Sequence, residues 1–345
     1  MKGLRMKILI FFIGLLLVWL ILSLLPKPQV IDGNNPFSAQ QNRPHIIAHG
    51  GGNMEFPDNT LEAYYHAFSI DENVILETDV NLTSDGVVVL SHDRTFDRKT
   101  TLVNAHVHEI SYQYLIDEAI DFGYENPIDG PNGFNTEAIF IKYENYQGNQ
   151  VTPQDVIYPE GIEPRHAYKF LATSLEDLIV HFPDNLIIVE LKQFGEQGDA
   201  LFDAVITLMD ELDDDYNTYE RIILASFHEQ IYERFKTLQS STHPQLLYSP
   251  QESSLTRFFV LHVLRLTVFF RDKPTAFQVP MAHGSINLAT QAFVNAARRH
   301  NIATHYWTIN DEEDMRTLIE LGVDGIMTDR PTLLKTLLDA YYPPN

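Results

Sequence analysis

From Pro44 to the end of the chain, short runs of β-branched and aliphatic residues alternate with stretches in which apolar residues recur every three or four positions. The first pattern predicts buried strands and the second amphipathic helices, and their alternation indicates βα units around a parallel sheet. The expected strands are 46–48, 74–79, 87–91, 186–191, 222–226, 245–248, 276–279, 303–308 and 324–327. The expected helices are 60–69, 174–181, 198–212, 229–238, 290–300 and 311–321. Nine strands are one more than an eight-stranded α/β barrel requires, so we expect one strand to belong to an insertion.

The extra strand is expected within residues 74–93, which read VILETDVNLTSDGVVVLSHD. Asp85-Gly86 lies between two apolar-rich runs, which favours a β-hairpin with a two-residue type I′ turn. Such a turn pairs Ser84 with Val87 and thereby fixes the register of the two strands. A loop of another length would shift that register.

Two carboxylates and a histidine gather on one face of this hairpin. Counting back from the turn places Asp79 opposite His92, and Glu77 shares the face of Asp79 because side chains alternate along a strand. One interpretation is a polar hairpin that faces solvent. The run ILETDV is also typical of a buried strand, however, and two buried carboxylates require a cation or a protonated partner. The hairpin therefore predicts a metal site or a catalytic site.

A third carboxylate, Glu190, ends the apolar run LIIVE and lies two residues before Lys192, on the same face of a strand. The plain alternative is an ordinary Glu–Lys pair on a strand rim. Three carboxylates in a chain without cysteine suit a hard cation, Ca²⁺ or Mg²⁺, better than zinc or copper. The sequence does not choose between calcium and magnesium.

The stretch AHGGGNMEFPDNT, residues 48–60, places His49 between a short buried strand and three glycines. Glycine permits positive φ angles and lets a ligand approach the main chain closely. A structural histidine beside a tight turn is the alternative interpretation. Asn59 or Thr60 is expected to cap the helix that follows.

Residues 8–25 form an uninterrupted apolar run of 18 residues, preceded by three basic residues. This length spans a bilayer core, and the basic flank predicts an amino terminus in the cytoplasm. A cleaved signal peptide is the competing interpretation, although the following PKPQV lacks an Ala-x-Ala site. We expect a cytoplasmic flank (1–7), a single transmembrane anchor (8–25), a polar linker (26–44) and a catalytic domain (45–340) on the extracytoplasmic side of the membrane.

The chain is strongly acidic, with 47 Asp and Glu against 24 Lys and Arg and a formal net charge of −23. Such a surface repels nucleic acid and anionic membranes at long range, so nucleic acid is excluded as a partner. The negative charge of the protein also repels any phosphate-containing substrate. A phosphate-directed site in this chain would therefore need a local metal ion or base.

Six sequence blocks between residues 45 and 335 resemble the glycerophosphodiester phosphodiesterase family, in the order and spacing of that family. They are AHGG…PDNTLEAYYHAF, ILETDVNLTSDGVVVLSHD, TSLEDLI, IIVELKQ, HYWTINDEEDM and LGVDGIMTDRP. The likeness is closest to the membrane-associated or lysophospholipase D-like members. The resemblance implies a TIM (β/α)₈ barrel with a β-hairpin insertion, here preceded by one transmembrane helix.

The resemblance also implies roles for individual residues. It assigns acid–base work to His49 and His92, and one divalent metal, Ca²⁺ or Mg²⁺, to Glu77, Asp79 and Glu190. The implied substrate-binding residues are Lys192, Trp307, Asn59, Gly50 and Gly51. Asn59 lies in a Pro-Asp-Asn-Thr sequence where the family has Pro-Glu-Asn-Thr.

One departure from the family concerns the phosphate. The usual His-Arg-Gly is His49-Gly50-Gly51 here, so an arginine that would face the phosphate is missing. Glycine cannot replace the planar fork of an arginine. Lys192, Arg94 or the backbone N–H groups of the glycines are the candidates to take over, the last as an anion-binding concavity.

The expected activity is metal-dependent hydrolysis of glycerophosphodiesters to glycerol 3-phosphate, or lysophosphatidate, and an alcohol. The substrate would be a glycerophosphodiester or a lysophospholipid. Two alternatives stay open: a related phospholipase D- or C-type phosphodiesterase for another headgroup, and a catalytically impaired, membrane-tethered binding protein. Which histidine acts as base, and the oligomeric state, are not visible in the sequence.

Two stretches are expected to shape substrate choice. Residues 123–166 form a long insertion rich in Gly, Asn, Pro and Tyr, and loops of this length are often functional. Residues 254–273 are largely apolar. They read either as an ordinary barrel helix or as an interfacial segment that docks on the bilayer.

Overall fold

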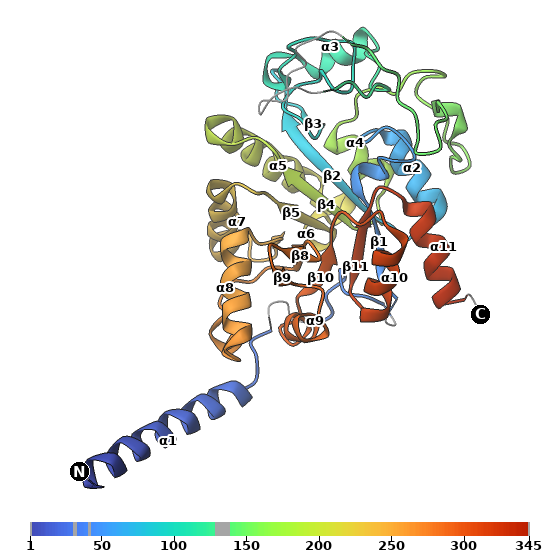
Figure 1. The fold of residues 1–345 in the computed structure, drawn as a ribbon. Helices are drawn as coiled ribbons and strands as arrows, with labels where there is room; N and C mark the ends of the chain where they lie inside the picture. The colour runs from blue at the N-terminus through green and yellow to red at the C-terminus, as the bar shows by residue number, and fades with distance from the viewer. Residues whose placement is uncertain (1, 30–32, 41–42, 128–138, 344–345) are drawn as a thin grey trace.

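Eight parallel strands form a nearly closed barrel in the computed structural model, which describes residues 2–29, 33–40, 43–127 and 139–343 (Figure 1). In barrel order the strands are β1 His45–Ala48, β2 Ile75–Leu82, β4 Ile187–Leu191, β5 Ile222–Ala225, β6 Leu247–Tyr248, β7 Ala276–Val279, β10 Ala303–Tyr306 and β11 Gly325–Thr328. β11 pairs with β1, and a backbone hydrogen bond of 2.8 Å from Thr275 N to Tyr248 O links β6 to the start of β7. The expected TIM barrel is confirmed.

Helices cover the outside of this barrel. They are α2 Leu61–Ile70, α4 Leu175–His181, α5 Gly195–Tyr216, α6 Thr218–Arg221, α7 Glu229–Ser241, α8 Glu252–Val263, α9 Gln291–Arg298, α10 Glu312–Leu321 and α11 Pro331–Tyr341. Capping side chains at Thr60, Ser174, Thr290 and Asp311 accept hydrogen bonds from first-turn N–H groups. The six expected helices are all present. The helices α6 and α11 were not expected, and α8 occupies part of residues 254–273, for which a barrel helix was one of two interpretations. Shorter 3₁₀ turns are η1 His49–Gly51, η2 Val107–Glu109, η3 Pro153–Asp155 and η4 Thr267–Phe269.

The barrel interior is packed with branched aliphatic side chains. The buried cluster contains Ile47, Ile75, Ile188, Ile223, Ala276, Ala303 and Met327. Phe37, from the segment expected to be a polar linker, is fully buried in the same cluster. Asn35 Nδ2 donates to Thr275 O at 2.8 Å, just before β7 begins. Part of the segment 26–44 therefore closes the floor of the barrel, at the amino ends of the strands.

The hairpin insertion exists, but its predicted register is wrong by one residue. β2 pairs with β3 (Val88–Leu90) so that Val80 faces Leu90. Ser91 N donates to Asp79 O at 2.8 Å, so Asp79 lies opposite Ser91 and not opposite His92.

A three-residue loop, 84–86, causes this shift. Gly86 has a φ of +81°, as expected for a left-handed residue that closes a three-residue hairpin loop. The Asp85 carboxylate accepts hydrogen bonds from Tyr112 N and Gln113 N at 2.9 and 3.2 Å. Asp85 thus caps the start of α3 (Tyr112–Asp117) rather than occupying a two-residue turn.

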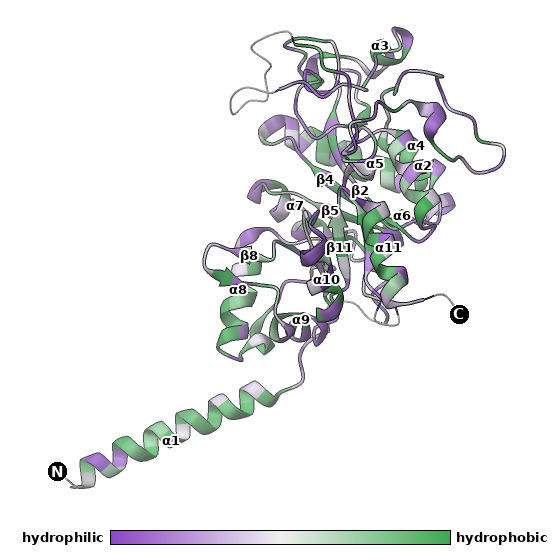
Figure 2. Ribbon diagram, turned by 45° about the vertical axis from the view of Figure 1, so that its right-hand side comes forward, coloured by the Kyte–Doolittle hydropathy of each residue, from purple (hydrophilic) through white to green (hydrophobic). Residues whose placement is uncertain are grey.

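The helix α1, Lys2–Leu24, projects away from the barrel (Figure 1). Its apolar part, Leu4–Leu24, is long and apolar enough to cross a membrane and is not buried in the molecule. Figure 2 shows hydrophobic residues along most of its length.

The insertion at 123–166 packs on the loop that follows β1; its residues 128–138 lie outside the described residues. Tyr143 OH donates to Asn53 O at 2.7 Å, and Tyr146 N donates to Met54 O at 2.8 Å. The described part of the insertion therefore braces the chain next to His49.

Candidate active site

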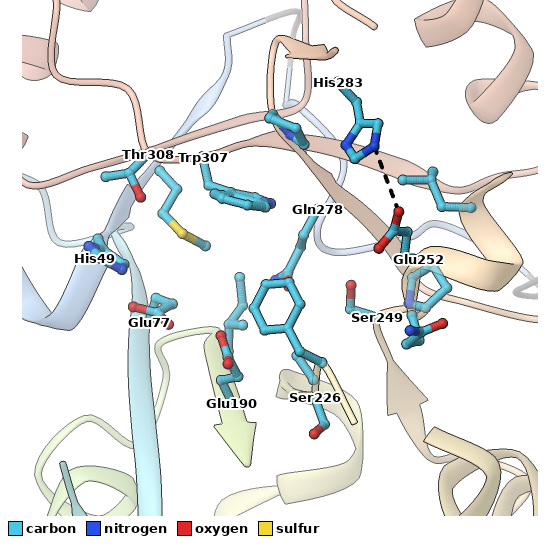
Figure 3. Close-up of a pocket in the computed structure, with 18 of the residues that line it drawn as sticks. His49, Glu77, Glu190, Ser226, Ser249, Glu252, Gln278, His283, Trp307 and Thr308 are labelled. Carbon is cyan, nitrogen blue, oxygen red and sulfur yellow. Dashed lines mark ion pairs between the residues drawn. The ribbon is translucent and has the colours of Figure 1, made fainter. Parts of the chain in front are cut away.

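A cavity of about 550 Å³ opens at the carboxyl ends of the barrel strands, where barrel enzymes carry their active sites (Figure 3). Its inner half is polar and is lined by His49, Glu77, Asp79, His92, Glu190 and Lys192. Its outer half is mostly apolar and is lined by Phe227, Leu255, Phe259, Ile286 and Leu288, with Glu252 and His283 at the rim. Gln278 and Trp307 lie between the two halves in Figure 3.

Three carboxylates meet in the inner half because two neighbouring strands present them at one level. Glu77 and Asp79 lie on β2, and the β2–β4 register aligns Asp79 with Glu190. One oxygen atom from each of the three lies within 4.8 Å of the others. The three residues would supply only oxygen ligands, the kind that Ca²⁺ and Mg²⁺ prefer. The donor set therefore fits one hard divalent cation.

The electrostatics of the carboxylates point the same way. Burial, together with the neighbouring Asp79, raises the pKa of Glu77 to about 8. For Asp79, burial also raises the pKa, but the ammonium group of Lys192 and the two histidines more than offset this and lower it. A carboxylate that resists ionisation at neutral pH needs additional positive charge beside it.

Lys192 bridges two of these carboxylates. Its Nζ lies 2.8 Å from Glu190 Oε1 and 3.1 Å from Asp79 Oδ1, and it lines the cavity. Burial lowers the pKa of this ammonium group, but the two carboxylates dominate and raise it. Lys192 is therefore a fixed positive charge at the level where a phosphate would lie.

Each of the two histidines of the inner half is oriented by an aspartate that the sequence analysis did not identify. His49 Nδ1 donates to Asp329 Oδ1 at 2.7 Å, and Asn310 Nδ2 donates to the other carboxylate oxygen at 2.6 Å. The sequence separation of 280 residues hides this pair. Asp329 does lie in the LGVDGIMTDRP block, which could have drawn attention to it.

His92 is oriented in the same way by its chain neighbour. Its Nδ1 donates to Asp93 Oδ1 at 2.9 Å, and Arg98 Nε donates to Asp93 Oδ2 at 2.6 Å. Arg98 also forms an ion pair with Asp58 at 3.1 Å. Although the hairpin register differs from the expected one, the chain leaving β3 still brings His92 to the cavity.

The charge of the inner half also sets the pKa of the histidines. Burial lowers the pKa of His49, but Glu77, Asp329 and Asp79 outweigh burial and raise it to about 10. The hydrogen bond to Asp93 is the largest influence on His92 and raises its pKa as well. A divalent cation would neutralise the carboxylates that act on His49 and would bring its pKa back towards the ordinary imidazole value.

The glycines after His49 do not form the expected phosphate-binding concavity. Gly50 N donates to Glu77 Oε2 at 2.9 Å, and Gly52 N donates to His49 O at 2.8 Å. A Cβ at Gly50, whose φ is +55°, would lie 2.8 Å from Asp58 Cβ, and a Cβ at Gly51 would lie 2.7 Å from Ala63 Cβ. The absence of a Cβ at Gly50 and Gly51 therefore permits close packing, and the Gly50 N–H positions the Glu77 carboxylate.

Asn59, which the resemblance implies in substrate binding, is hydrogen-bonded to Asp79 of the carboxylate cluster. Its Oδ1 accepts from the backbone N of Asp79 at 3.1 Å, and its Nδ2 donates to Asp79 Oδ2 at 3.2 Å. Arg94, the other candidate to replace the arginine, stacks over Phe194 instead, 4.7 Å from the ring centroid. Of the candidates, Lys192 is the one that lines the cavity.

Gln278 is a cavity residue that sequence reasoning missed. Its Nε2 is buried and has no hydrogen-bond partner among the described residues. A buried donor without a partner is costly, so a ligand in the cavity is its natural acceptor. Trp307, as expected, lines the same region and packs edge to face with Phe227 at 6.1 Å.

The model of the glycerophosphoryl diester phosphodiesterase family matches residues 49–333. A glycerophosphodiester phosphodiesterase of Caldanaerobacter subterraneus subsp. tengcongensis is 25% identical over 295 residues, which cover 85% of this chain and 97% of that protein. Lysophospholipase D GDPD3 of Mus musculus is 24% identical over 320 residues, with coverage of 85% and 82%.

Solved structures show the same fold. The glycerophosphoryl diester phosphodiesterase domain of a Mycobacterium tuberculosis protein superposes with a TM-score of 0.60 at 16% identity, covering 85% of this chain and 98% of that one. The glycerophosphodiester phosphodiesterase of Thermotoga maritima gives a TM-score of 0.53 at 21% identity, with coverage of 85% and 98%. The family match spans well over half of the chain, and the chain therefore belongs to the glycerophosphoryl diester phosphodiesterase family of metal-dependent phosphodiester hydrolases.

Proposed function

We propose that the protein hydrolyses a glycerophosphodiester, using one divalent cation held by Glu77, Asp79 and Glu190 and the acid–base pair His49 and His92. The observation that carries the proposal is the convergence of three carboxylates and two aspartate-oriented histidines on one half of one cavity. The products would be an alcohol and glycerol 3-phosphate, or lysophosphatidate when the glycerol carries an acyl chain.

The two histidines move the protons. Because each Nδ1–H is held by an aspartate, Nε2 is the nitrogen left to exchange a proton with substrate. One imidazole takes a proton from the attacking hydroxyl, and the other protonates the departing alcohol oxygen. An imidazole near its ordinary pKa of about 6.5 serves either role at neutral pH.

Fixed donor groups of the protein would stabilise the negative charge on the phosphate oxygens. Lys192 and the buried Nε2 of Gln278 are one positive and one neutral donor among the residues that line the cavity. When bound, a divalent cation supplies further charge compensation and lowers the pKa of a hydroxyl that it contacts. Lys192 thus takes over part of what the missing family arginine would do.

The outer half of the cavity favours a substrate with an acyl chain. Phe227, Leu255 and Phe259 offer an apolar wall beyond the polar centre, and the name of the mouse relative refers to a lysophospholipid. A soluble glycerophosphodiester would use only the inner half. We infer that a lysophospholipid fills both halves.

We further infer that α1 anchors the protein in a membrane as a single pass. The support is its length and composition together with its exposure. The basic residues before the apolar run favour a cytoplasmic amino terminus, which would leave the barrel on the extracytoplasmic side. A reporter enzyme fused to the carboxyl terminus, active only outside the cytoplasm, tests this topology.

The decisive assay incubates the purified full-length protein with glycerophosphocholine and with lysophosphatidylcholine, before and after chelation and with added Ca²⁺ or Mg²⁺. The proposal expects choline release that requires the cation, and a phosphomonoester in the ³¹P NMR spectrum. A cyclic phosphate would indicate attack by the substrate's own hydroxyl instead of water. Binding without turnover under every condition would favour the tethered binding protein that Gly50 leaves open.

A further inference from the structure

Four large apolar side chains are exposed within ten residues where α8 ends and η4 begins. Val260, Val263, Leu264 and Phe269 are 50%, 63%, 50% and 47% exposed. We call residues 260–271 the α8–η4 corner. Exposed apolar clusters of this kind commonly mark a contact with a partner or a membrane.

The corner touches α1. Trp19 Nε1 donates to Leu264 O at 2.9 Å. Beyond α1, Gln29 Nε2 donates to Arg299 O at 3.3 Å and Pro28 O receives a hydrogen bond from His300 at 3.0 Å. The corner is therefore held at the carboxyl end of α1 (Figure 1).

The length of α1 fixes the depth of this contact. The 21-residue candidate span Leu4–Leu24 extends roughly 31 Å, about the thickness of a bilayer core of ~30 Å, so little length is spare. Trp19 lies five residues before Leu24, which places it roughly 8 Å from the end of the helix. If α1 spans the membrane, Trp19 and the Leu264 carbonyl that it contacts lie inside the hydrocarbon boundary, roughly 8 Å from the end of the span.

The local charge fits an anionic bilayer surface. Residues 251–300 contain six Lys and Arg against two Asp and Glu, a net charge of +4 in a chain of −23. A groove of about 910 Å³ between α1 and the barrel is lined by Lys27, Arg265 and Arg299. Basic side chains beside exposed apolar ones are typical of surfaces that rest on anionic lipid.

We propose that the α8–η4 corner is a second membrane contact, in which Val260, Val263, Leu264 and Phe269 insert into the interface of an anionic bilayer beside α1. The inference rests on the proposed role of α1 as an anchor. Its consequence concerns access to the cavity. Phe259 and Leu255, on the same helix α8, line the outer half of the cavity, so the cavity would open within one to two helical turns of the bilayer surface.

Single-cysteine labelling tests this directly because the chain contains no cysteine. Nitroxide labels are placed at Val263→Cys and Phe269→Cys in the full-length protein, reconstituted in nanodiscs of phosphatidylcholine with phosphatidylglycerol. Leu16→Cys in α1 is the lipid reference, and Ile157→Cys, at a position 73% exposed on the insertion, is the aqueous reference. Collision rates with oxygen, which concentrates in lipid, and with a water-soluble nickel chelate report the depth of each label.

The proposal expects positions 263 and 269 to collide with nickel several-fold less than position 157, as position 16 does. Values at both positions equal to those at 157, with position 16 in lipid, would overturn the second contact and leave the anchor standing. An aqueous value at position 16 would overturn the anchor and the corner contact together. Hydrolysis of soluble glycerophosphocholine by the same samples reports the proposed activity separately.

The basic residues provide a second, independent arm. Arg265→Glu with Arg271→Glu, combined with Val263→Cys, is expected to raise the nickel collision rate at position 263 several-fold in the same discs. Arg316→Glu with Lys236→Glu, on α10 and α7 and outside residues 251–300, is the matched charge control. Equal collision rates in the two combinations would contradict an attraction between the corner and anionic lipid.

Discussion

The two halves of the cavity are built by different parts of the fold. The inner half stands on strands: Glu77 and Asp79 on β2 and Glu190 on β4, with their positions set by a backbone register. The outer half stands on α8 and on the short hairpin of β8 (Ala282–His283) and β9 (Ile286–Asn287), which follow the barrel strands. Rigid strands thus hold the three carboxylates proposed to bind the cation, and connecting segments carry the apolar surface proposed to contact an acyl chain.

The two halves of the cavity also differ in how completely their polar groups are hydrogen-bonded. In the inner half nearly every polar group has a partner that orients it, as in the pairs His49–Asp329 and His92–Asp93. In the outer half the rim pair His283–Glu252 is long, at 3.8 Å, and both side chains are about two-thirds exposed. A change in the inner half should therefore affect turnover, and a change in the outer half should affect which substrate binds.

The largest effect is expected from the histidines of the inner half. His49→Gln and His92→Gln each should lower kcat by roughly 10²–10⁴-fold, the usual contribution of a positioned acid or base, with little change in KM. His283→Gln at the rim is the matched control and should alter kcat far less. Equal losses in all three variants, at unchanged thermal stability, would break the distinction between the two halves.

The second-largest effect is expected on the affinity for the activating cation. Glu190→Gln should weaken the affinity for the activating cation by at least ~10–100-fold, because it removes one of three oxygen ligands. The measurement is choline release as a function of Ca²⁺ or Mg²⁺ concentration after chelation. Glu252→Gln, a carboxylate of the outer half, should leave the cation dependence unchanged, and a similar shift in both variants would argue against a metal site at the three carboxylates.

The pH dependence of folding stability provides a further test of the charged groups in the inner half. Without cation, Glu77 has a pKa of about 8 against 4.5 unfolded, so folding loses stability as pH rises from about 4.5 to 8. His49, with a pKa of about 10 against 6.5, contributes stability that is complete below pH 6.5 and is lost as pH rises towards 10. The melting temperature of the chelated protein should thus fall between pH 6 and pH 9.

Added cation should raise the melting temperature more at pH 9 than at pH 6, since more carboxylate is then ionised. Differential scanning calorimetry at the two pH values measures this. His49→Gln in the chelated protein should show a smaller fall with pH. A cation effect of equal size at both pH values would show that Glu77 does not take part in binding.

The apolar wall of the outer half should discriminate between substrates. Phe259→Ala and Leu255→Ala should each lower kcat/KM for lysophosphatidylcholine by about 10-fold, from the loss of ~1–3 kcal/mol of apolar contact. Their kcat/KM for glycerophosphocholine should stay near that of the wild type. Parallel losses on both substrates would mean that no acyl chain lies along α8.

The smallest effect is expected between the two halves, at Gln278. Gln278→Met removes a buried donor that has no partner in the protein, so KM should rise a few-fold, equivalent to ~0.5–1.5 kcal/mol, while thermal stability stays equal or increases. A lower stability with unchanged KM would show that Gln278 is a packing residue. Gln193→Met is not a suitable control, because the side-chain amide of Gln193 both accepts a hydrogen bond from the backbone of Leu82 and donates one to it, and the substitution would break both.

The sequence predicted the barrel well because its strands and helices are regular. All nine expected strands are present, and the carboxylates of the inner half could be placed because alternation along β2 puts Glu77 and Asp79 on one face. The predicted hairpin register was wrong because the observed loop is tied to hydrogen bonds that the Asp85 carboxylate accepts from the backbone N–H groups of Tyr112 and Gln113. No local pattern reports contacts over that sequence distance.

The hydrogen-bond partners of the site residues were harder to predict. Asp329 lies at the opposite end of the barrel domain sequence from His49, and only closure of the barrel between β11 and β1 brings them together. The family resemblance implied substrate contacts for Gly50 and Asn59. In the structure Gly50 N donates to Glu77 and Asn59 Nδ2 donates to Asp79, and these contacts depend on packing against α2 and β2 that sequence spacing does not reveal.

Metal content and turnover measured on the same samples test the central claim most directly. Chelated protein is titrated with Ca²⁺ or Mg²⁺, and bound ion per chain is compared with the rate of choline release, for the wild type and for Asp79→Asn. We predict that turnover rises in proportion to occupancy of one site in the wild type, and that Asp79→Asn shows neither tight binding nor turnover. Full turnover by wild-type samples that contain no bound divalent ion would contradict the account.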